Sequence, residues 1–310
     1  MQTFLQFLNH KFSPIVLANI AIFITMLAWG TSFISTKIAV AEIPPFTLAF
    51  IRFFMTSLLL FAIIKKSEPT TKLTTKSSGK IALAGFIGIS LYFCFENTGI
   101  KLTTAANASL ITSITPILSI ALNMIVFKAR LSLLESFGVF IGILGAYLTV
   151  TANGNLDFSS SHFQGNLYMI GAMIAWAFYT ILSKHLQKLH TGIFLVTWQT
   201  IFATIFLIPF ALSEYQEWQL FSLHSFLQVV YLSVICSGLG YFLYVYSLKT
   251  LDVVVTTLYL NLIPIIGVIT GYLVLNESIL PIQLLGGAII IFAIFIANFN
   301  HIFKFFSKRN

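Results

Sequence analysis

Two charged side chains stand inside long apolar stretches of this sequence. Arg52 lies within the apolar stretch 44–64, and Glu96 lies in "FCFENTGIKL", near the end of the apolar stretch 80–100. A charge in hydrocarbon is costly unless it is paired or faces water. We therefore interpret Arg52 as a group that binds an anionic substrate group such as a carboxylate, and Glu96 as a group that takes an ammonium or a proton.

The depths of these two residues predict that they influence each other. At 1.5 Å per helical residue, Arg52 lies about 12 Å from the start of its stretch and Glu96 about 6 Å from the end of its own. We expect both to face an aqueous cavity. Two alternatives stay open: a structural Arg–Glu pair that locks the two helices together, and a Glu96 that lies close enough to the lipid headgroups to be solvated.

Other polar and aromatic residues in the apolar stretches could line the same cavity. A mostly aromatic cleft with a few hydrogen-bonding groups suits a small amphipathic solute. The alternative is that the Asn and Gln side chains join helices to one another and that the Trp and Tyr side chains lie at the membrane interface. The candidate substrate contacts besides Arg52 and Glu96 are Trp29, Asn97, Asn107, Trp176, Tyr179, Gln199, Tyr241 and Tyr259.

The composition indicates an integral membrane protein. Hydrophobic residues make up 58% of the 310 residues and charged residues only 8%, against about 25% charged in soluble domains. A transmembrane helix needs about 20 mostly apolar residues. Ten stretches qualify: 15–38, 44–64, 80–100, 103–127, 131–151, 165–185, 193–212, 224–248, 253–275 and 281–303.

The connections between these stretches alternate in charge. Fourteen of the 17 Lys and Arg residues fall on one side of the membrane, and five acidic residues fall on the other. Because basic residues concentrate in cytoplasmic loops, we expect a multi-pass protein of the inner (plasma) membrane with both termini in the cytoplasm. The same rule accounts for the net charge of +8, so we expect no nucleic-acid partner.

The sequence also repeats itself. The Ala-Trp pairs at Trp29 and Trp176 lie 147 residues apart, and Pro116 and Pro264 lie 148 apart. A repeat of five helices is reversed in its second copy, which gives the inverted repeat typical of secondary transporters. The predicted fold is therefore an all-α membrane protein of ten transmembrane helices in two inverted five-helix repeats, 15–151 and 165–303, with a cytoplasmic segment 1–14 and a basic tail 304–310. Since proline removes a backbone hydrogen bond, we interpret Pro116 and Pro264 as paired structural hinges.

Several of these segments resemble the EamA-type family of the drug/metabolite transporter superfamily. The resemblance rests on "LAWGTSFISTKIA", on "PPFTLAFIRFF" with Arg52, on "LTTAANASLITSITPILSIAL", and on "LYLNLIPIIGVITGYLVLNESILPIQLLGGAIII". It implies ten helices in two inverted repeats and the export of small metabolites or amino acids. The acidic residue of the last segment, Glu277, has Ala129 as its counterpart in the first repeat, so we interpret it as a structural or interface residue.

The leading interpretation is a secondary transporter that works by alternating access through a central cavity. The sequence holds no nucleotide-binding P-loop of the form GxxxxGK[ST], and we expect no cofactor, no metal and no catalytic residue. The expected partners are a small-molecule substrate, the lipid bilayer and protons, with the protein a monomer or a homodimer. The alternatives are a lipid or lipid-intermediate flippase of the same fold and an intramembrane enzyme.

Overall fold

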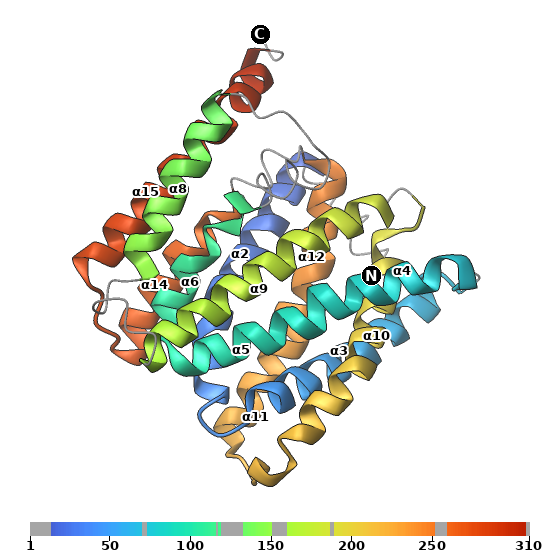
Figure 1. Cartoon of the computed structure of the whole chain (residues 1–310). Helices are drawn as coiled ribbons and strands as arrows, with labels where there is room; N and C mark the ends of the chain where they lie inside the picture. Colours follow the sequence, from blue (N-terminus) through green and yellow to red (C-terminus); the bar gives the residue numbers. More distant parts are fainter. Residues whose placement is uncertain are drawn as a thin grey trace.

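The computed structural model describes residues 14–69, 73–115, 117–118, 133–150, 160–186, 189–251 and 259–307, and every regular element in these ranges is a helix (Figure 1). The elements are α2 (Pro14–Ala39), α3 (Pro45–Ser67), α4 (Thr75–Gly85), η1 (Phe86–Leu91), α5 (Tyr92–Leu102), α6 (Ala105–Thr112), α8 (Leu133–Val150), α9 (Ser161–Leu186), α10 (Gly192–Ser213), η2 (Tyr215–Glu217), α11 (Leu223–Val230), η3 (Tyr231–Leu239), α12 (Gly240–Thr250), α14 (Leu262–Leu275) and α15 (Pro281–Ser307).

Six of the described helices are long and apolar enough to cross a membrane. They are Pro14–Ala39, Pro45–Ser67, Ser77–Leu102, Ser161–Ser183, Gly192–Ser213 and Leu223–Tyr244. These six coincide with six of the predicted spans. The helices α6, α8 and α14 fall inside three of the other four, parts of which lie outside the described residues, and α15 runs past the end of the fourth, so the count of ten stays a prediction.

The helices form a central bundle with a separate pair along one side. In the bundle α3 packs against α10, α5 against α9, and α2 against both α12 and α14, whereas α8 packs along α15 at the upper left of Figure 1. A Cβ atom on Gly145 would lie 2.8 Å from the Gly286 carbonyl oxygen, and one on Gly286 would lie 2.7 Å from that of Gly145. These glycines therefore let two helices of the same chain approach closely.

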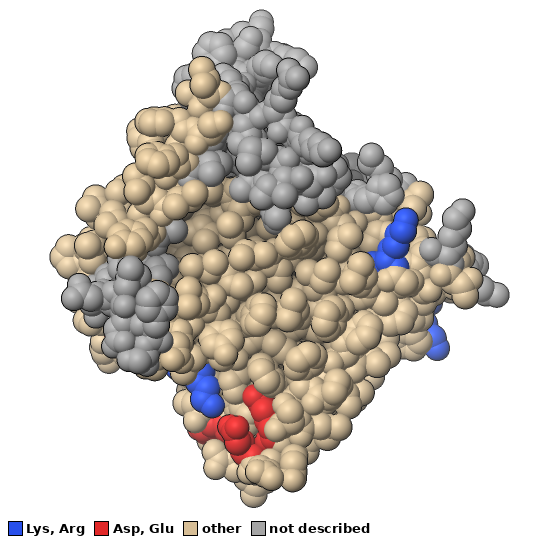
Figure 2. Space-filling view, in the orientation of Figure 1, with Lys and Arg blue, Asp and Glu red and all other residues tan. Residues whose placement is uncertain are grey.

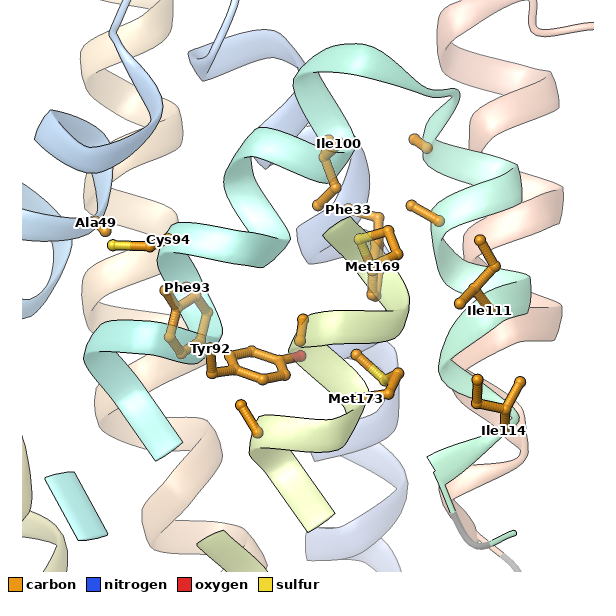
Figure 3. Packing of buried hydrophobic residues seen from close by; sticks show 14 of the residues in the cluster. Phe33, Ala49, Tyr92, Phe93, Cys94, Ile100, Ile111, Ile114, Met169 and Met173 are labelled. Atoms are coloured by element: carbon orange, nitrogen blue, oxygen red, sulfur yellow. The ribbon is translucent and has the colours of Figure 1, made fainter. Parts of the chain in front are cut away.

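The surface of the bundle is apolar and its interior is tightly packed. Figure 2 shows a broad band without charged side chains across the middle of the molecule. Large apolar side chains are exposed on the described helices, for example Leu58 and Phe137, as expected for helices that face lipid. Inside, one buried cluster includes Tyr92 and Phe93 of α5 and Met169 and Met173 of α9 (Figure 3).

Two of the long helices contain π-helical segments. The segment η1 joins α4 to α5, and η3 joins α11 to α12. Widened turns of this kind are frequent at functional sites. Two carbonyl oxygens of η3 accept hydrogen bonds from side chains of other helices: Cys236 from the Trp29 indole at 2.9 Å and Ser233 from the Thr56 hydroxyl at 3.1 Å.

One of the two predicted hinge prolines, Pro264, lies close to a break in a helix. Pro264 is the third residue of α14, and the helix is interrupted just before it at Asn261. Because proline cannot donate to the preceding turn, the interruption one turn before Pro264 has a physical cause. Pro116 lies outside the described residues, and the hinge function of both prolines stays a prediction.

Candidate functional site

Arg52 is buried in α3 and faces η3. Its side chain is 3% exposed, and its Nε donates to the Ser237 hydroxyl at 2.9 Å. The guanidinium carbon lies 4.4 Å from the centroid of the Phe93 ring and 5.4 Å from that of Phe53, within the range of cation–π attraction. Its Nη1 has no hydrogen-bond partner. A buried charged donor without a partner is rare and costly, so Nη1 is free to hold an acceptor on a ligand.

Glu96, which lies in α5, is also buried. Its side chain is 6% exposed, so in this structure neither lipid headgroups nor the predicted aqueous cavity solvates it. The Tyr92 hydroxyl donates to Glu96 Oε1 at 2.6 Å. Within the described residues no nitrogen of Arg52 lies within 4.0 Å of a Glu96 carboxylate oxygen. Arg52 and Glu96 therefore form no direct ion pair in this structure.

Asn97, the next residue along α5, carries a second unpaired polar atom. Its side chain is fully buried, and its Nδ2 donates to the Pro45 carbonyl oxygen at the start of α3 at 2.9 Å. Its Oδ1 has no partner. The interface between α3 and α5 thus holds one unpaired donor, Arg52 Nη1, and one unpaired acceptor, Asn97 Oδ1.

Six aromatic rings from four helices form a cluster beside these residues, which we name the aromatic cluster. Its members are Trp29, Tyr92, Trp176, Tyr179, Tyr241 and Tyr244. The Trp29 and Trp176 rings meet edge to face with centroids 6.4 Å apart, and Tyr92 lies 5.3 Å from Trp176. Tyr92 thereby links Glu96 to the aromatic cluster, which offers flat apolar faces and several hydroxyls.

The predicted residue Gln199 reaches the same cluster from α10. Its Oε1 accepts from the Tyr179 hydroxyl at 3.0 Å, and its Nε2 donates to the Ser183 hydroxyl at 3.2 Å. Gln199 is 1% exposed. The structure therefore brings together eight of the ten predicted substrate contacts: Trp29, Arg52, Glu96, Asn97, Trp176, Tyr179, Gln199 and Tyr241.

The remaining two predicted contacts belong to other hydrogen-bond networks. Asn107 Nδ2 donates to Asn166 Oδ1 at 2.6 Å, and Asn107 Oδ1 accepts from Gln283 at 3.2 Å, which ties α6 to α9 and α15. The Tyr259 hydroxyl donates to Asn19 Oδ1 at 2.9 Å. The Asn107 contacts match the alternative interpretation, in which Asn and Gln side chains join helices, and Tyr259 likewise bonds to a residue of another helix.

The sequence interpretation missed three residues that complete the site. Phe93 lies against the Arg52 guanidinium, Ser237 accepts from its Nε, and Tyr92 donates to Glu96. Tyr92 precedes Glu96 by four residues, a spacing that places two side chains on one helix face, so this contact could have been inferred. No local signal marks Ser237. Within the described residues no group of three or more His, Cys, Asp or Glu side chains could hold a metal ion.

The fold and the buried site define a class, the multi-helix membrane proteins with a polar centre, and sequence comparison gives the family. The family model of the EamA-like transporters matches the chain twice, over residues 16–151 and 163–299. The chain belongs to the EamA-like transporter family and is a multi-pass membrane protein.

Relatives and one solved structure agree with this assignment. An uncharacterized transporter of Archaeoglobus fulgidus is 32% identical over 275 residues, which cover 88% of this chain and 94% of the relative. A "probable terminal-alkyne amino-acid exporter" of Streptantibioticus cattleyicolor is 24% identical over 278 residues, which cover 90% of this chain and 92% of the relative. A crystal structure with 19% identity superposes with a TM-score of 0.64 over 91% of this chain and 96% of the other, a likeness of fold alone.

Proposed function

We propose that this protein is a secondary transporter of the inner (plasma) membrane that exports small metabolites such as amino acids. The observation that carries the proposal is the unpartnered Arg52 Nη1, buried beside the aromatic cluster. A carboxylate is the natural partner of such a guanidinium, and an apolar side chain of the substrate would lie against the aromatic rings. The printed name of the Streptantibioticus relative, an amino-acid exporter, agrees with this substrate class.

We further propose that transport proceeds by alternating access between two inverted repeats. The two family matches begin 147 residues apart. Two pairs of residues with the same separation touch each other: Trp29 with Trp176, and the Ser57 hydroxyl with that of Thr204 at 2.9 Å. Equivalent residues that touch lie next to a pseudo-twofold axis, and this supports the inverted arrangement.

The test is exchange of radiolabelled solutes in proteoliposomes that contain the purified protein. We expect uptake of at least one amino acid from a panel, and none of the amine that lacks its carboxylate. Arg52→Gln should weaken binding of that amino acid by about 10- to 150-fold, the equivalent of about 1.5–3 kcal/mol for one hydrogen bond to a charged group. Lys65→Gln, which removes an exposed charge from the same helix, is the matched control.

Three results would contradict the proposal. Arg52→Gln could fold and transport as the wild type does, or the amine could be carried as well as the amino acid. In the same vesicles, movement of a labelled lipid without movement of any amino acid would favour the flippase alternative.

Protons are the proposed coupling ion, with Glu96 as the group that binds them. Glu96 is a carboxyl group buried inside a membrane helix, with the Tyr92 hydroxyl as its hydrogen-bond donor, and an ionisable group at such a depth is a natural carrier of protons. A proton gradient should therefore drive transport by the wild type and fail to drive it in Glu96→Gln, while exchange without a gradient persists. If Glu96→Gln still responds to the gradient, Glu96 does not bind the coupling ion.

A further inference from the structure

The helices α3 and α10 pack side by side, and both end on the same dipeptide. Ser67-Glu68 closes α3 and Ser213-Glu214 closes α10, 146 residues later. The middles of the two helices meet through the hydroxyls of Ser57 and Thr204, and the helices run antiparallel, since the end of each lies beside the start of the other. Glu68 and Glu214 are thus the C-cap residues at opposite ends of one helix pair, although their separation is one residue shorter than the 147 residues between Ser57 and Thr204.

At one end of the pair the contact is tight. Glu214 is 8% exposed, and its carboxylate accepts from the Phe46 N–H at 3.1 Å, the Thr47 N–H at 2.7 Å and the Thr47 hydroxyl at 2.9 Å. The N-cap residue of α3, Pro44, supplies no side-chain cap of its own. Glu214 thus caps α3 from another part of the chain, where the helix dipole favours a negative charge. The Trp218 indole adds a bond to the Thr47 hydroxyl at 2.8 Å.

At the other end the equivalent contact is loose. The Glu68 carboxylate accepts one hydrogen bond from the Thr191 hydroxyl at 3.0 Å, at an exposed position. Thr191 itself caps α10 by accepting from the Phe194 N–H at 3.3 Å. The two C-cap carboxylates therefore make unequal contacts, one engaged with backbone amides of a helix start and one at the edge of such a start.

We propose that Glu214 and Glu68 are alternating locks at the two ends of the transporter. The structure is the state in which the Glu214 end is closed. When the repeats exchange conformations, Glu68 moves onto the first turn of α10 and Glu214 leaves the first turn of α3. This inference rests on the proposed alternating access, and it adds the two residues that hold each end shut.

The test measures the opening of each end without any substrate. Pairs of spin labels are placed on exposed residues, at Ala41 and Gln216 for the Glu214 end and at Lys66 and Leu189 for the Glu68 end. Distance distributions are recorded by electron–electron double resonance in lipid nanodiscs, with the buried cysteines Cys94 and Cys236 replaced by alanine in every sample.

Glu214→Gln should raise the ratio of open to closed molecules at the Glu214 end by about tenfold or more. A factor of ten corresponds to about 1.4 kcal/mol, which is no more than one charge-assisted hydrogen bond. Glu68→Gln should shift the ratio the other way, because it weakens the competing state. Trp218→Phe should act like Glu214→Gln but less strongly, and Glu217→Gln, an exposed residue of the same connection, should act as the wild type.

Several outcomes would overturn the locks: a Glu214→Gln variant indistinguishable from Glu217→Gln, shifts in the same direction for Glu214→Gln and Glu68→Gln, or one unchanging distance in all samples. If Glu214→Gln does not fold, Trp218→Phe decides in its place. Opposite shifts in a protein that carries no amino acid would keep the locks and reject the proposed substrate. Transport without any shift would keep the proposed function and reject the locks.

Discussion

Glu277 offers a sharp test of how this fold is stabilised, because one side chain joins two distant segments. It follows α14, and its carboxylate accepts from the N–H groups of Ala105 and Ala106, at 2.8 Å each, in the first turn of α6. Asn276, directly before it, has φ of 53° and turns the chain out of α14. The acidic residue that the sequence marks as structural is thus a helix cap supplied from 171 residues away.

The size of the effect follows from these contacts. Two charge-assisted hydrogen bonds would contribute about 3–6 kcal/mol together. Glu277 is half-buried, and Thr104 already caps α6 by accepting from the Asn107 N–H at 3.0 Å. When the carboxylate is removed, water and Thr104 therefore replace part of its stabilising free energy. We expect Glu277→Ala to lower the free energy of unfolding by about 2–3 kcal/mol, and Glu277→Gln, which keeps one acceptor oxygen, by about 1 kcal/mol.

The assay is reversible unfolding in mixed detergent micelles followed by tryptophan fluorescence. Glu217→Ala is the matched control, since Glu217 forms an exposed pair with Lys101 at 4.0 Å and such pairs contribute less than about 1 kcal/mol. If Glu277→Ala unfolds at the same free energy as Glu217→Ala, the cap does not stabilise the protein and the reasoning from its geometry is wrong.

Two further predictions concern a close contact and an exposed cap. A Cβ atom on Gly88 would overlap Cδ2 and Cγ of Tyr179, so Gly88→Ala should lower the thermal midpoint in detergent. The control is Gly79→Ala, which has nothing within 4 Å of the new atom and should leave the midpoint unchanged or raise it slightly. Equal midpoints for the two variants would refute the contact. The N–H and hydroxyl of Ser222 hold the pKa of Glu42, which lies outside the membrane helices, below its ordinary value of 4.5. A carboxyl with a lowered pKa stabilises the fold above pH 4.5, and this contribution is lost as the pH falls through its lowered pKa. Glu42→Gln should therefore reduce the difference in thermal midpoint between pH 6 and pH 3 that the wild type shows, and an unchanged difference would refute the assignment.

Much of the fold could be predicted from the sequence because the membrane imposes a local rule. A spanning segment must be apolar over its whole length and satisfy its own backbone. The predicted spans 44–64 and 193–212 accordingly match α3 and α10 within a few residues. Trp29 and Trp176, which the repeat places at equivalent positions, contact each other in the structure.

The candidate residues could be named from the sequence, but their contacts could not. A buried charge in an apolar stretch signals a functional or paired residue by its cost alone, which is why Arg52 and Glu96 stood out. Their partners were not visible: Arg52 bonds Ser237, 185 residues away, and Glu96 bonds Tyr92. The Ser-Glu pairs that end α3 and α10 were present in the sequence but carry meaning only once the two helices are seen antiparallel.

The sequence by itself thus determined that the chain is a membrane protein, where six of its helices run, and that its two halves are related. These properties depend on hydropathy and spacing, which act along the chain. Only the tertiary structure decided which polar atoms are paired and which, like Arg52 Nη1 and Asn97 Oδ1, have no hydrogen-bond partner. Hydrogen bonds act over about 3 Å, and the crossing of helices far apart in the sequence sets distances at that scale.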